Sequence, residues 1–176
     1  LLRLLITGGL GFIGSHLVER LLEDGYRVKV VDNFSNGKVT NLGSAVNHKD
    51  LEIYDLDIRE YGALTKIFKR TRFVFHLAAL ADIVPSIEDP QLYFDTNVKG
   101  TLNVVEAAKE TNVEKVIYSA SSSCYGMRNT PPFTEKSAIS TEYPYALTKY
   151  LGEQILVHWG KVYGIQYASL RLFNVY

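Results

Sequence analysis

The sequence predicts an α/β fold in which a doubly wound parallel sheet carries helices on both of its faces. Apolar runs of strand length alternate along the chain with longer segments of helical periodicity, and this alternation is typical of right-handed βαβ units. A glycine-rich turn joins the first apolar run to the first helical segment. Sheets of this kind bind ligands at the carboxyl ends of their strands, so we expect the functional residues at that edge.

The predicted elements cover most of the chain. We expect strands at Leu1–Ile6, Tyr26–Val31, Leu51–Asp57, Phe73–Ala79, Lys115–Ala120 and Ile165–Leu172, and helices at Phe12–Glu23, Glu60–Arg70, Pro90–Thr111 and Glu142–Tyr163. Asn33–Gly43 lacks strong periodicity and is predicted to be a polar loop. Helical spacing predicts that the first helix buries Phe12, Ile13, Leu17, Val18, Leu21 and Leu22.

Length and composition restrict the class of protein. A chain of 176 residues can bury one core, so we expect a single domain over residues 1–176. Nineteen basic and nineteen acidic residues cancel, which gives no reason to expect a nucleic-acid or membrane partner. The apolar runs are too short for a transmembrane segment or a signal peptide. The lone Cys124 favours a reducing, cytoplasmic location over an oxidising one.

The turn after the first apolar run predicts a pyrophosphate site. Gly8, Gly11 and Gly14 stand three residues apart, where glycine permits a tight turn and a close approach of the backbone to phosphate. The amino end of the following helix would face the same phosphates. An ordinary strand–helix turn is the alternative, but an acid about 20 residues further on is typical of dinucleotide binding. No Gly-Lys-Ser/Thr follows, which argues against a triphosphate-binding loop.

That acid, Asp32, closes the second apolar run and indicates which cofactor is used. A carboxylate accepts hydrogen bonds from a ribose 2′-hydroxyl and repels a 2′-phosphate. Lys38 is the nearby cation that could pair with such a phosphate, and no arginine directly follows Asp32. We therefore predict NAD rather than NADP.

Tyr145 and Lys149 are candidates for proton transfer, because a spacing of four places them on one face of a helix. A free tyrosine has a pKa near 10 and is a poor base at neutral pH. A neighbouring ammonium and an oxidised nicotinamide would both favour the phenolate. The phenolate could then take a proton from an alcohol as hydride leaves the same carbon. The alternative is an ordinary surface pair, since the chain has 12 tyrosines.

A serine-rich segment, Ser119–Ser123, follows the fifth predicted strand. Hydroxyl groups there would lie at the ligand crevice and could hydrogen-bond the substrate oxygen that is oxidised. The alternative is a turn in which the serines cap backbone groups.

Eight motifs in order resemble a known family. They are Thr7-Gly-Gly-x-Gly-x-x-Gly14, Asp32-Asn33, Asp57-Ile58, His76-Leu-Ala-Ala79, Asn97-Val-x-Gly-Thr101, the Ser119–Gly126 loop, Tyr145-x-x-x-Lys149 and Leu170-Arg-Leu-Phe-Asn174. Together the motifs resemble the extended short-chain dehydrogenases/reductases, and specifically the NAD-dependent nucleotide-sugar epimerase/dehydratase family. Within it, the greatest likeness is to UDP-glucose 4-epimerases and related UDP-hexose epimerases. The resemblance covers essentially the whole chain and implies a Rossmann-type fold.

The resemblance also implies residue roles. Ser121 would match the catalytic Ser/Thr, Tyr145 the base, and Lys149 the residue that binds the nicotinamide ribose. The cofactor-binding set would be Gly8, Gly11, Phe12, Ile13, Gly14, Asp32, Asn33, Asn36, Gly37, Asp57, Ile58, Leu77, Ala78, Ala79, Asn97, Ser119, Tyr145, Lys149 and Phe173. The substrate set would be Ser121, Ser122, Ser123, Tyr145 and Asn174.

Details of the motifs indicate which reaction to expect. The dehydratase branch carries Asp-Glu after its catalytic Thr, whereas this chain has Ser122 and Ser123, which favours an epimerase acting through a transient 4-keto sugar. Galactose epimerases tend to have lysine where this chain has Ala81. The segment 84–90 resembles the branch that serves polysaccharide biosynthesis, which leaves the hexose open. One alternative is a nucleotide-sugar dehydratase, decarboxylase or reductase. The other, of a different class, is a non-catalytic NAD-binding module.

Three further expectations concern assembly and metals. The family's smaller C-terminal substrate domain would follow Tyr176, so the resemblance implies that the chain is a fragment that lacks it. Helices 90–111 and 143–163 carry more apolar surface than one sheet face needs, and the family often pairs such helices in a homodimer. No Cys/His spacing suggests zinc, and His16 and His76 are expected to pack or hydrogen-bond locally, so no metal site is predicted.

Overall fold

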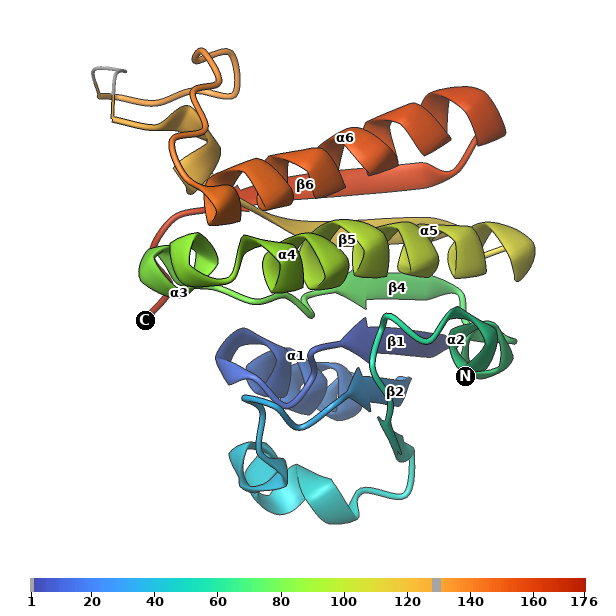
Figure 1. Ribbon diagram of the computed structural model, residues 1–176. Helices are drawn as coiled ribbons and strands as arrows, with labels where there is room; N and C mark the ends of the chain where they lie inside the picture. The colour runs from blue at the N-terminus through green and yellow to red at the C-terminus, as the bar shows by residue number, and fades with distance from the viewer. Residues whose placement is uncertain (1, 128–130) are drawn as a thin grey trace.

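Within the part of the chain that the structure describes, the sheet has six parallel strands, and helices pack against both of its faces (Figure 1). The computed structural model describes residues 2–127 and 131–176. The strand order is β3-β2-β1-β4-β5-β6, so the winding direction reverses between β1 and β4, and doubly wound sheets bind ligands at that reversal. In chain order the strands are β1 (Arg3–Thr7), β2 (Arg27–Asp32), β3 (Leu51–Asp55), β4 (Phe73–His76), β5 (Lys115–Ser121) and β6 (Gln166–Leu172).

Helical segments connect the strands and divide between the two faces. One face carries α2, α5 and α6, and the other carries α1 and η1. In chain order these segments are α1 (Phe12–Glu23), the 3₁₀ helix η1 (Val39–Asn47), α2 (Tyr61–Phe68), α3 (Ile83–Glu88), α4 (Pro90–Tyr93), the π-helical segment η2 (Phe94–Lys99), α5 (Gly100–Glu110), the 3₁₀ turn η3 (Ser122–Tyr125) and α6 (Pro144–Tyr163).

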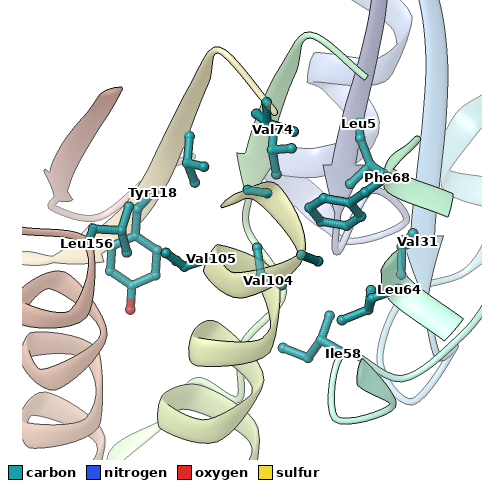
Figure 2. Close-up of a cluster of buried hydrophobic side chains, with 14 of the residues drawn as sticks. Leu5, Val31, Ile58, Leu64, Phe68, Val74, Val104, Val105, Tyr118 and Leu156 are labelled. Carbon is teal, nitrogen blue, oxygen red and sulfur yellow. The ribbon is translucent and has the colours of Figure 1, made fainter. Parts of the chain in front are cut away.

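Two hydrophobic clusters hold the layers together. Successive side chains of a strand point to opposite faces, so Leu5 of β1 joins the cluster on the α5 side while Leu4 and Ile6 join the cluster on the α1 side. Figure 2 shows the α5-side cluster, in which Phe68 of α2 lies against the sheet and is fully buried. Burying one such side chain stabilises the fold by about 1.5–3 kcal/mol.

The predicted strands and helices are confirmed, with shifted ends. The predicted helix Phe12–Glu23 has the observed bounds, but β4 ends at His76 rather than Ala79. Beyond His76 the backbone leaves the ladder, because the N–H of Ala78 donates to Thr7 Oγ1 and that of Leu80 donates to Asn97 Oδ1. Leu1 of the first predicted strand and residues 128–130 after the serine-rich segment lie outside the described residues.

The long helix predicted at Pro90–Thr111 is divided in the structure. The chain forms α4, widens into the π-helical η2 and tightens again into α5. Asn97 of η2 turns its amide inward to the backbone of Leu80, and π-helical turns of this kind are frequent at functional sites. The preceding helix α3 was not predicted.

Two further predictions were wrong. Phe12 is 55% exposed instead of buried, because it begins α1 and its ring packs edge-to-face on His16 at the surface. The predicted loop Asn33–Gly43 contains the start of η1, whose Leu42 is fully buried in the α1-side cluster.

Candidate functional site

The glycine turn between β1 and α1 is packed so closely that side chains do not fit. Gly8 has a φ of +71°, and a Cβ there would lie 2.7 Å from the backbone nitrogen of Ala78. A Cβ on Gly14 would lie 2.2 Å from the carbonyl oxygen of Gly8. Gly11 is the N-cap of α1. The first turn of α1 therefore sits directly against the end of β1, with its free N–H groups toward the crevice.

A cavity of about 350 Å³ opens beside this turn, at the carboxyl ends of the central strands. Its size is within the range of small-molecule sites. Eleven of the predicted cofactor-binding residues line it: Gly8, Gly11, Asp32, Asn33, Asn36, Gly37, Asp57, Ile58, Leu77, Ala78 and Ala79. The lining also includes residues that sequence reasoning missed, namely Val31, Ser35, Leu56, Arg59, Leu80, Leu92 and Thr96. Five of these residues stand directly next to predicted motifs in the sequence, and this adjacency could have indicated them: Val31, Leu56, Arg59, Leu80 and Thr96.

Asp32 is anchored at the rim of the cavity by backbone donors. Its Oδ2 accepts from the N–H of Leu10 at 3.0 Å, and its Oδ1 accepts from the N–H of Phe34 at 3.0 Å. Each carboxylate oxygen has two lone pairs, so each can still accept a hydrogen bond from a ligand. The contact with Leu10 ties the end of β2 to the glycine turn and fixes the direction of the carboxylate.

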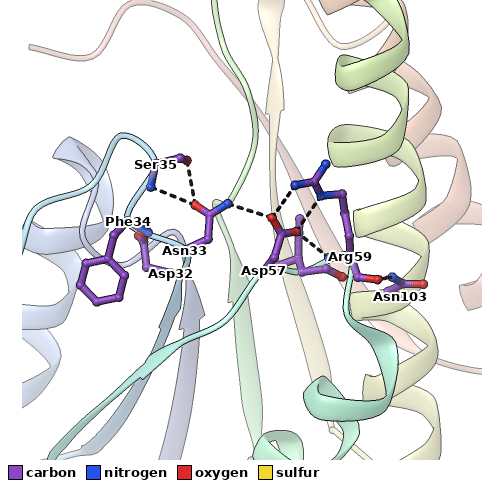
Figure 3. A network of polar contacts seen from close by, with 8 residues as sticks. Asp32, Asn33, Phe34, Ser35, Asp57, Arg59 and Asn103 are labelled. Carbon is purple, nitrogen blue, oxygen red and sulfur yellow. Dashed lines mark hydrogen bonds and ion pairs between the residues drawn. The ribbon is translucent and has the colours of Figure 1, made fainter.

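A polar bridge spans the loops that follow β2 and β3 (Figure 3). Asn33 Nδ2 donates to Asp57 Oδ2 at 2.9 Å. Arg59 donates to both oxygens of Asp57, from Nε at 2.9 Å and from Nη2 at 2.8 Å. The hydrogen bonds from Arg59 lower the pKa of Asp57 to about 2. Asp57 is therefore a fixed anion on the cavity wall, and the bridge holds the two loops at a set separation.

Lys149 projects from α6 into the interior without a carboxylate partner among the residues that the structure describes. Its side chain is 4% exposed, and its Nζ lies 4.5 Å from the centre of the Tyr118 ring. Burial lowers the pKa of Lys149 to about 7. Tyr145 begins the same helix face one turn earlier, partly exposed, with its ring 6.5 Å from that of Tyr93. A phenol and an ammonium thus stand at i and i+4, as the sequence predicts.

The serine-rich segment forms the end of β5 and the start of η3. Ser121 is the N-cap of η3: its Oγ accepts from the N–H of Ser123 at 3.2 Å, and the two hydroxyl oxygens lie 2.7 Å apart. Ser121, Ser122 and Ser123 are all partly exposed. Ser121 therefore caps the turn, as the alternative interpretation of the serine-rich segment expected. Because Ser121 is partly exposed, its hydroxyl can also contact a ligand.

Asn97 joins the cavity to α6. Its Oδ1 accepts from the N–H of Leu80 at 2.8 Å, and its Nδ2 donates to the carbonyl of Leu80 at 2.9 Å and to Thr148 Oγ1 at 3.1 Å. The side chain is 1% exposed, so it braces the cavity wall from inside. A direct contact between Asn97 and a cofactor stays a prediction.

The remaining predicted residues lie outside the lining of the cavity. Ile13 is half-buried in the first turn of α1, Ser119 is half-buried in β5, and Phe173 and Asn174 are exposed beyond β6. Phe173 packs on Phe133, with 5.9 Å between ring centres. Phe12 is exposed as described above. Roles for these residues toward a ligand also stay predictions.

His76 and Cys124 are buried inside the fold. His76 is hydrogen-bonded through both ring nitrogens, to Thr7 at 2.7 Å and to Thr101 at 2.9 Å, which confirms the local packing predicted for it. Burial raises the pKa of the Cys124 thiol. Among residues 2–127 and 131–176, no group of three or more His, Cys, Asp or Glu side chains could hold a metal ion, and no helix could cross a membrane.

Comparison with known proteins places this geometry in a family. UDP-glucose 4-epimerase 2 of Arabidopsis thaliana is 39% identical over 158 residues, which are 86% of this chain and 45% of that protein. The structure of a UDP-N-acetylglucosamine 4-epimerase from Methanobrevibacter ruminantium, in complex with UDP-N-acetylmuramic acid, has a TM-score of 0.94 and 40% identity, covering 99% of this chain and 55% of that one.

UDP-glucose 4-epimerase from Brucella ovis, solved in complex with NAD, has a TM-score of 0.91 and 35% identity, covering 99% of this chain and 52% of that one. The chain thus spans about half the length of the proteins it matches. The family model of the NAD dependent epimerase/dehydratase family matches residues 4–176. On this match and these identities, the chain belongs to the NAD dependent epimerase/dehydratase family.

Proposed function

We propose that the protein containing this chain is an NAD-dependent nucleotide-sugar epimerase that acts on a UDP-hexose. The observation that carries the proposal is the buried ammonium of Lys149, one helical turn from Tyr145 on a helix braced to the cavity wall. The similar proteins named above are epimerases of UDP-sugars. Residues 1–176 would be the NAD-binding domain of that enzyme.

In this proposal the cavity holds NAD through the residues that line it. The turn at Gly8 and Gly11 would hold the pyrophosphate, and Asp32 would accept a hydrogen bond from a ribose hydroxyl. Leu77, Ala78 and Ala79 offer an apolar wall. When bound, NAD supplies a hydride acceptor that later returns the hydride. Equal or tighter binding of NADP than of NAD in a titration would contradict the role given to Asp32.

The chain's own residues would move the proton. Tyr145 takes the proton from the sugar hydroxyl as the carbon is oxidised, and Lys149 favours the phenolate through its positive charge. Ser121 hydrogen-bonds the reacting oxygen, with Ser122, Ser123 and Asn174 along the substrate. The sugar then passes through a 4-keto form and is reduced on its opposite face, so the centre is inverted with no net oxidation.

The test is the Tyr145→Phe variant of the full-length protein, assayed with UDP-glucose and UDP-galactose. General-base catalysis contributes about 10²- to 10⁴-fold, so turnover should fall by at least that lower factor. Tyr163→Phe is the matched control, because Tyr163 lies at the far end of α6 and is 53% exposed. Wild-type turnover by Tyr145→Phe would contradict the mechanism.

Product analysis separates the epimerase from its relatives. Ser122 and Ser123 offer neither a strong acid nor a strong base, so we expect no loss of water from the keto sugar. Formation of a dehydrated or decarboxylated sugar, or net consumption of NADH, would assign the protein to another branch of the family.

We further propose a cytoplasmic homodimer in polysaccharide biosynthesis. Support for the dimer comes from exposed apolar side chains of α6, where Val157 and Val162 are 38% and 53% exposed. Apolar side chains grouped on one helix are typical of an interface. Light scattering of the full-length protein tests this assembly, and a monomer at micromolar concentration would contradict it.

A further inference from the structure

A buried acid lies one helical turn beyond Lys149. Tyr145, Lys149 and Glu153 follow one another at intervals of four on α6 and therefore share a face. Lys149 is 4% exposed and Glu153 is 6% exposed. An acid and a lysine at i and i+4 of a helix can form an ion pair, yet within the described residues the ion pair of Glu153 is made with Arg171.

Arg171 of β6 occupies both oxygens of that carboxylate. Its Nη2 donates to Glu153 Oε1 at 2.6 Å, and its Nε donates to Glu153 Oε2 at 3.0 Å. Ser169, also on β6, donates its hydroxyl to Oε2 at 2.9 Å. Three donors from one strand thus turn the carboxylate toward β6. A bidentate arginine fixes direction as well as charge.

The guanidinium is itself held from the serine-rich side of the site. Nη1 of Arg171 donates to the hydroxyl of Tyr125 at 3.0 Å, and its Cζ lies 5.1 Å from the centre of the Tyr125 ring. Tyr125 ends the η3 turn that Ser121 caps. Hydrogen bonds to Glu153 and Tyr125 raise the pKa of Arg171, so it stays a cation. Arg171 therefore contacts the two elements that carry Ser121 and Lys149.

We propose that Arg171 is a positioning residue of the active site: by holding both oxygens of Glu153, it keeps that carboxylate from pairing with Lys149, whose ammonium stays available to a ligand. This inference rests on the proposed function only in naming the ligand, which would be the ribose of the bound nicotinamide. The pairing of Glu153 with Arg171 instead of Lys149 is a property of the fold, and the pKa of Lys149 reports it without any reaction.

Among the groups around Lys149 that are named below, Glu153 is the acid that could pair with its ammonium. Tyr118 of β5 presents its ring face to the ammonium, and His76 of β4 is buried and neutral, with a pKa lowered to about 3 by burial and by the charge of Lys149. Tyr145 and Glu153 flank Lys149 on its own helix, and Arg171 stands behind Glu153 on β6. Without Arg171, the carboxylate of Glu153 would be left without its cation, four residues along the helix from Lys149.

The experiment compares four variants of the full-length protein: Arg171→Met, Glu153→Gln, the double variant, and Ser169→Ala. The readouts are the pKa of Lys149, followed by NMR of isotopically labelled lysine, and the affinity for NAD. An opposite charge within about 4–6 Å shifts a pKa by about 1–3 units. We therefore expect Arg171→Met to raise the pKa of Lys149 by about one unit or more and to weaken NAD binding roughly tenfold.

The double variant decides between positioning and packing. A neutral amide at position 153 cannot capture the ammonium, so Glu153→Gln/Arg171→Met should restore the pKa of Lys149 and most of the NAD affinity. Glu153→Gln alone should not raise the pKa of Lys149. If the double variant binds NAD as weakly as Arg171→Met, Arg171 acts through packing on Tyr125 and the proposal is wrong. An unchanged pKa of Lys149 in Arg171→Met would also overturn it.

Ser169→Ala covers the case in which Arg171→Met does not fold, because it removes one donor and leaves the ion pair in place. It should raise the pKa of Lys149 in the same direction by a smaller amount, and no shift would count against the proposal. Failure of Tyr145→Phe to lower turnover would remove the proposed reaction and leave the titration of Lys149 unaffected, so the two hypotheses fail separately.

Discussion

The hydroxyl of Thr7 lies 2.7 Å from Nδ1 of His76 and joins the end of β1 to the end of β4 beneath the glycine turn. On the other side of the ring, Nε2 lies 2.9 Å from Thr101 Oγ1. Thr101 donates its own proton to the carbonyl of Asn97 at 2.6 Å, so it must accept from the imidazole. His76 is therefore the neutral tautomer protonated on Nε2, and Thr7 donates to Nδ1.

The buried imidazole predicts a loss of stability in acid. Burial, with the charge of Lys149, lowers the pKa of His76 to about 3 from its ordinary 6.5. Because this pKa is lower in the folded protein than in the unfolded chain, the unfolded chain binds the proton more readily. The fold therefore loses stability as the pH falls below the pKa that His76 has in the unfolded chain. Between about pH 6.5 and 3, His76 should therefore contribute a decline of up to roughly 1.4 kcal/mol per pH unit.

Denaturant unfolding at several pH values checks this prediction. His76→Gln keeps a hydrogen-bonding side chain that does not titrate, so its stability should depend less on pH in that interval, whatever its absolute value. His16→Gln is the control, because His16 is a surface residue on α1. Equal slopes for wild type and His76→Gln would contradict the assignment of a neutral buried His76.

The close packing at the glycine turn predicts opposite effects of one substitution at two positions. In Gly14→Ala, the new Cβ would lie 2.2 Å from the carbonyl oxygen of Gly8, so α1 must move from β1, and we expect a loss of about 1–3 kcal/mol together with weaker NAD binding. In Gly62→Ala, no atom lies within 4 Å of the new Cβ, and alanine should stabilise α2 by about 0.5–1 kcal/mol. Thermal unfolding of both variants tests the contrast, which equal shifts would refute.

The bridge over the cavity predicts a titration change at Asp57. Arg59→Met removes the hydrogen bonds that lower its pKa to about 2, so the value should rise toward the ordinary 3.8. The stability that this ion pair supplies is present above about pH 4 and is lost as the pH falls toward 2. NAD affinity should fall severalfold, because the loops after β2 and β3 lose a shared anchor.

NMR titration of the Asp57 carboxyl and an NAD binding curve provide the measurements. Arg20→Met is the matched control, since Arg20 makes an ion pair with Asp24 that is exposed on α1. It should leave NAD affinity unchanged. An equal loss of affinity in both variants would mean that the effect is one of net charge and not of the bridge.

The two phenylalanines Phe68 and Phe12 should differ sharply in their contribution to stability. Phe68 is fully buried against the sheet, whereas Phe12 is 55% exposed. Replacing a buried phenylalanine with alanine costs about 3–5 kcal/mol, and an exposed one changes stability by about 0.5 kcal/mol. Chemical denaturation of Phe68→Ala and Phe12→Ala measures both, and comparable losses would contradict the assigned faces of α1 and α2.

Much of the fold was predictable because its signals are local. The glycines of the first turn, the apolar run that ends at Asp32 and the spacing of Tyr145 and Lys149 each occupy a short stretch of sequence. The exposure of Phe12 was mispredicted since helical spacing assigns a face to a side chain but does not say how far the sheet extends beneath the first turn.

What sequence reasoning missed depends on contacts between distant residues. The π-helical η2 carries Asn97, whose side chain hydrogen-bonds the backbone of Leu80, 17 residues away in the sequence. The end of β4 is set by Thr7, which is 71 residues from the backbone nitrogen it binds at Ala78. The place of Arg59 in the cavity wall depends on a bidentate contact with Asp57. Periodicity carries no information about such partners.

The side-chain amide of Asn97 connects the wall of the cavity to α6 through hydrogen bonds to Leu80 and Thr148. A molecule that fills the cavity restrains Leu80, and the hydrogen bonds of Asn97 pass that restraint to Thr148, beside Lys149. Local opening of α6 should therefore become rarer when the cavity is occupied, and amide hydrogen exchange along the first turns of α6 would slow. Binding in the cavity would in this way order the helix that carries Tyr145 and Lys149.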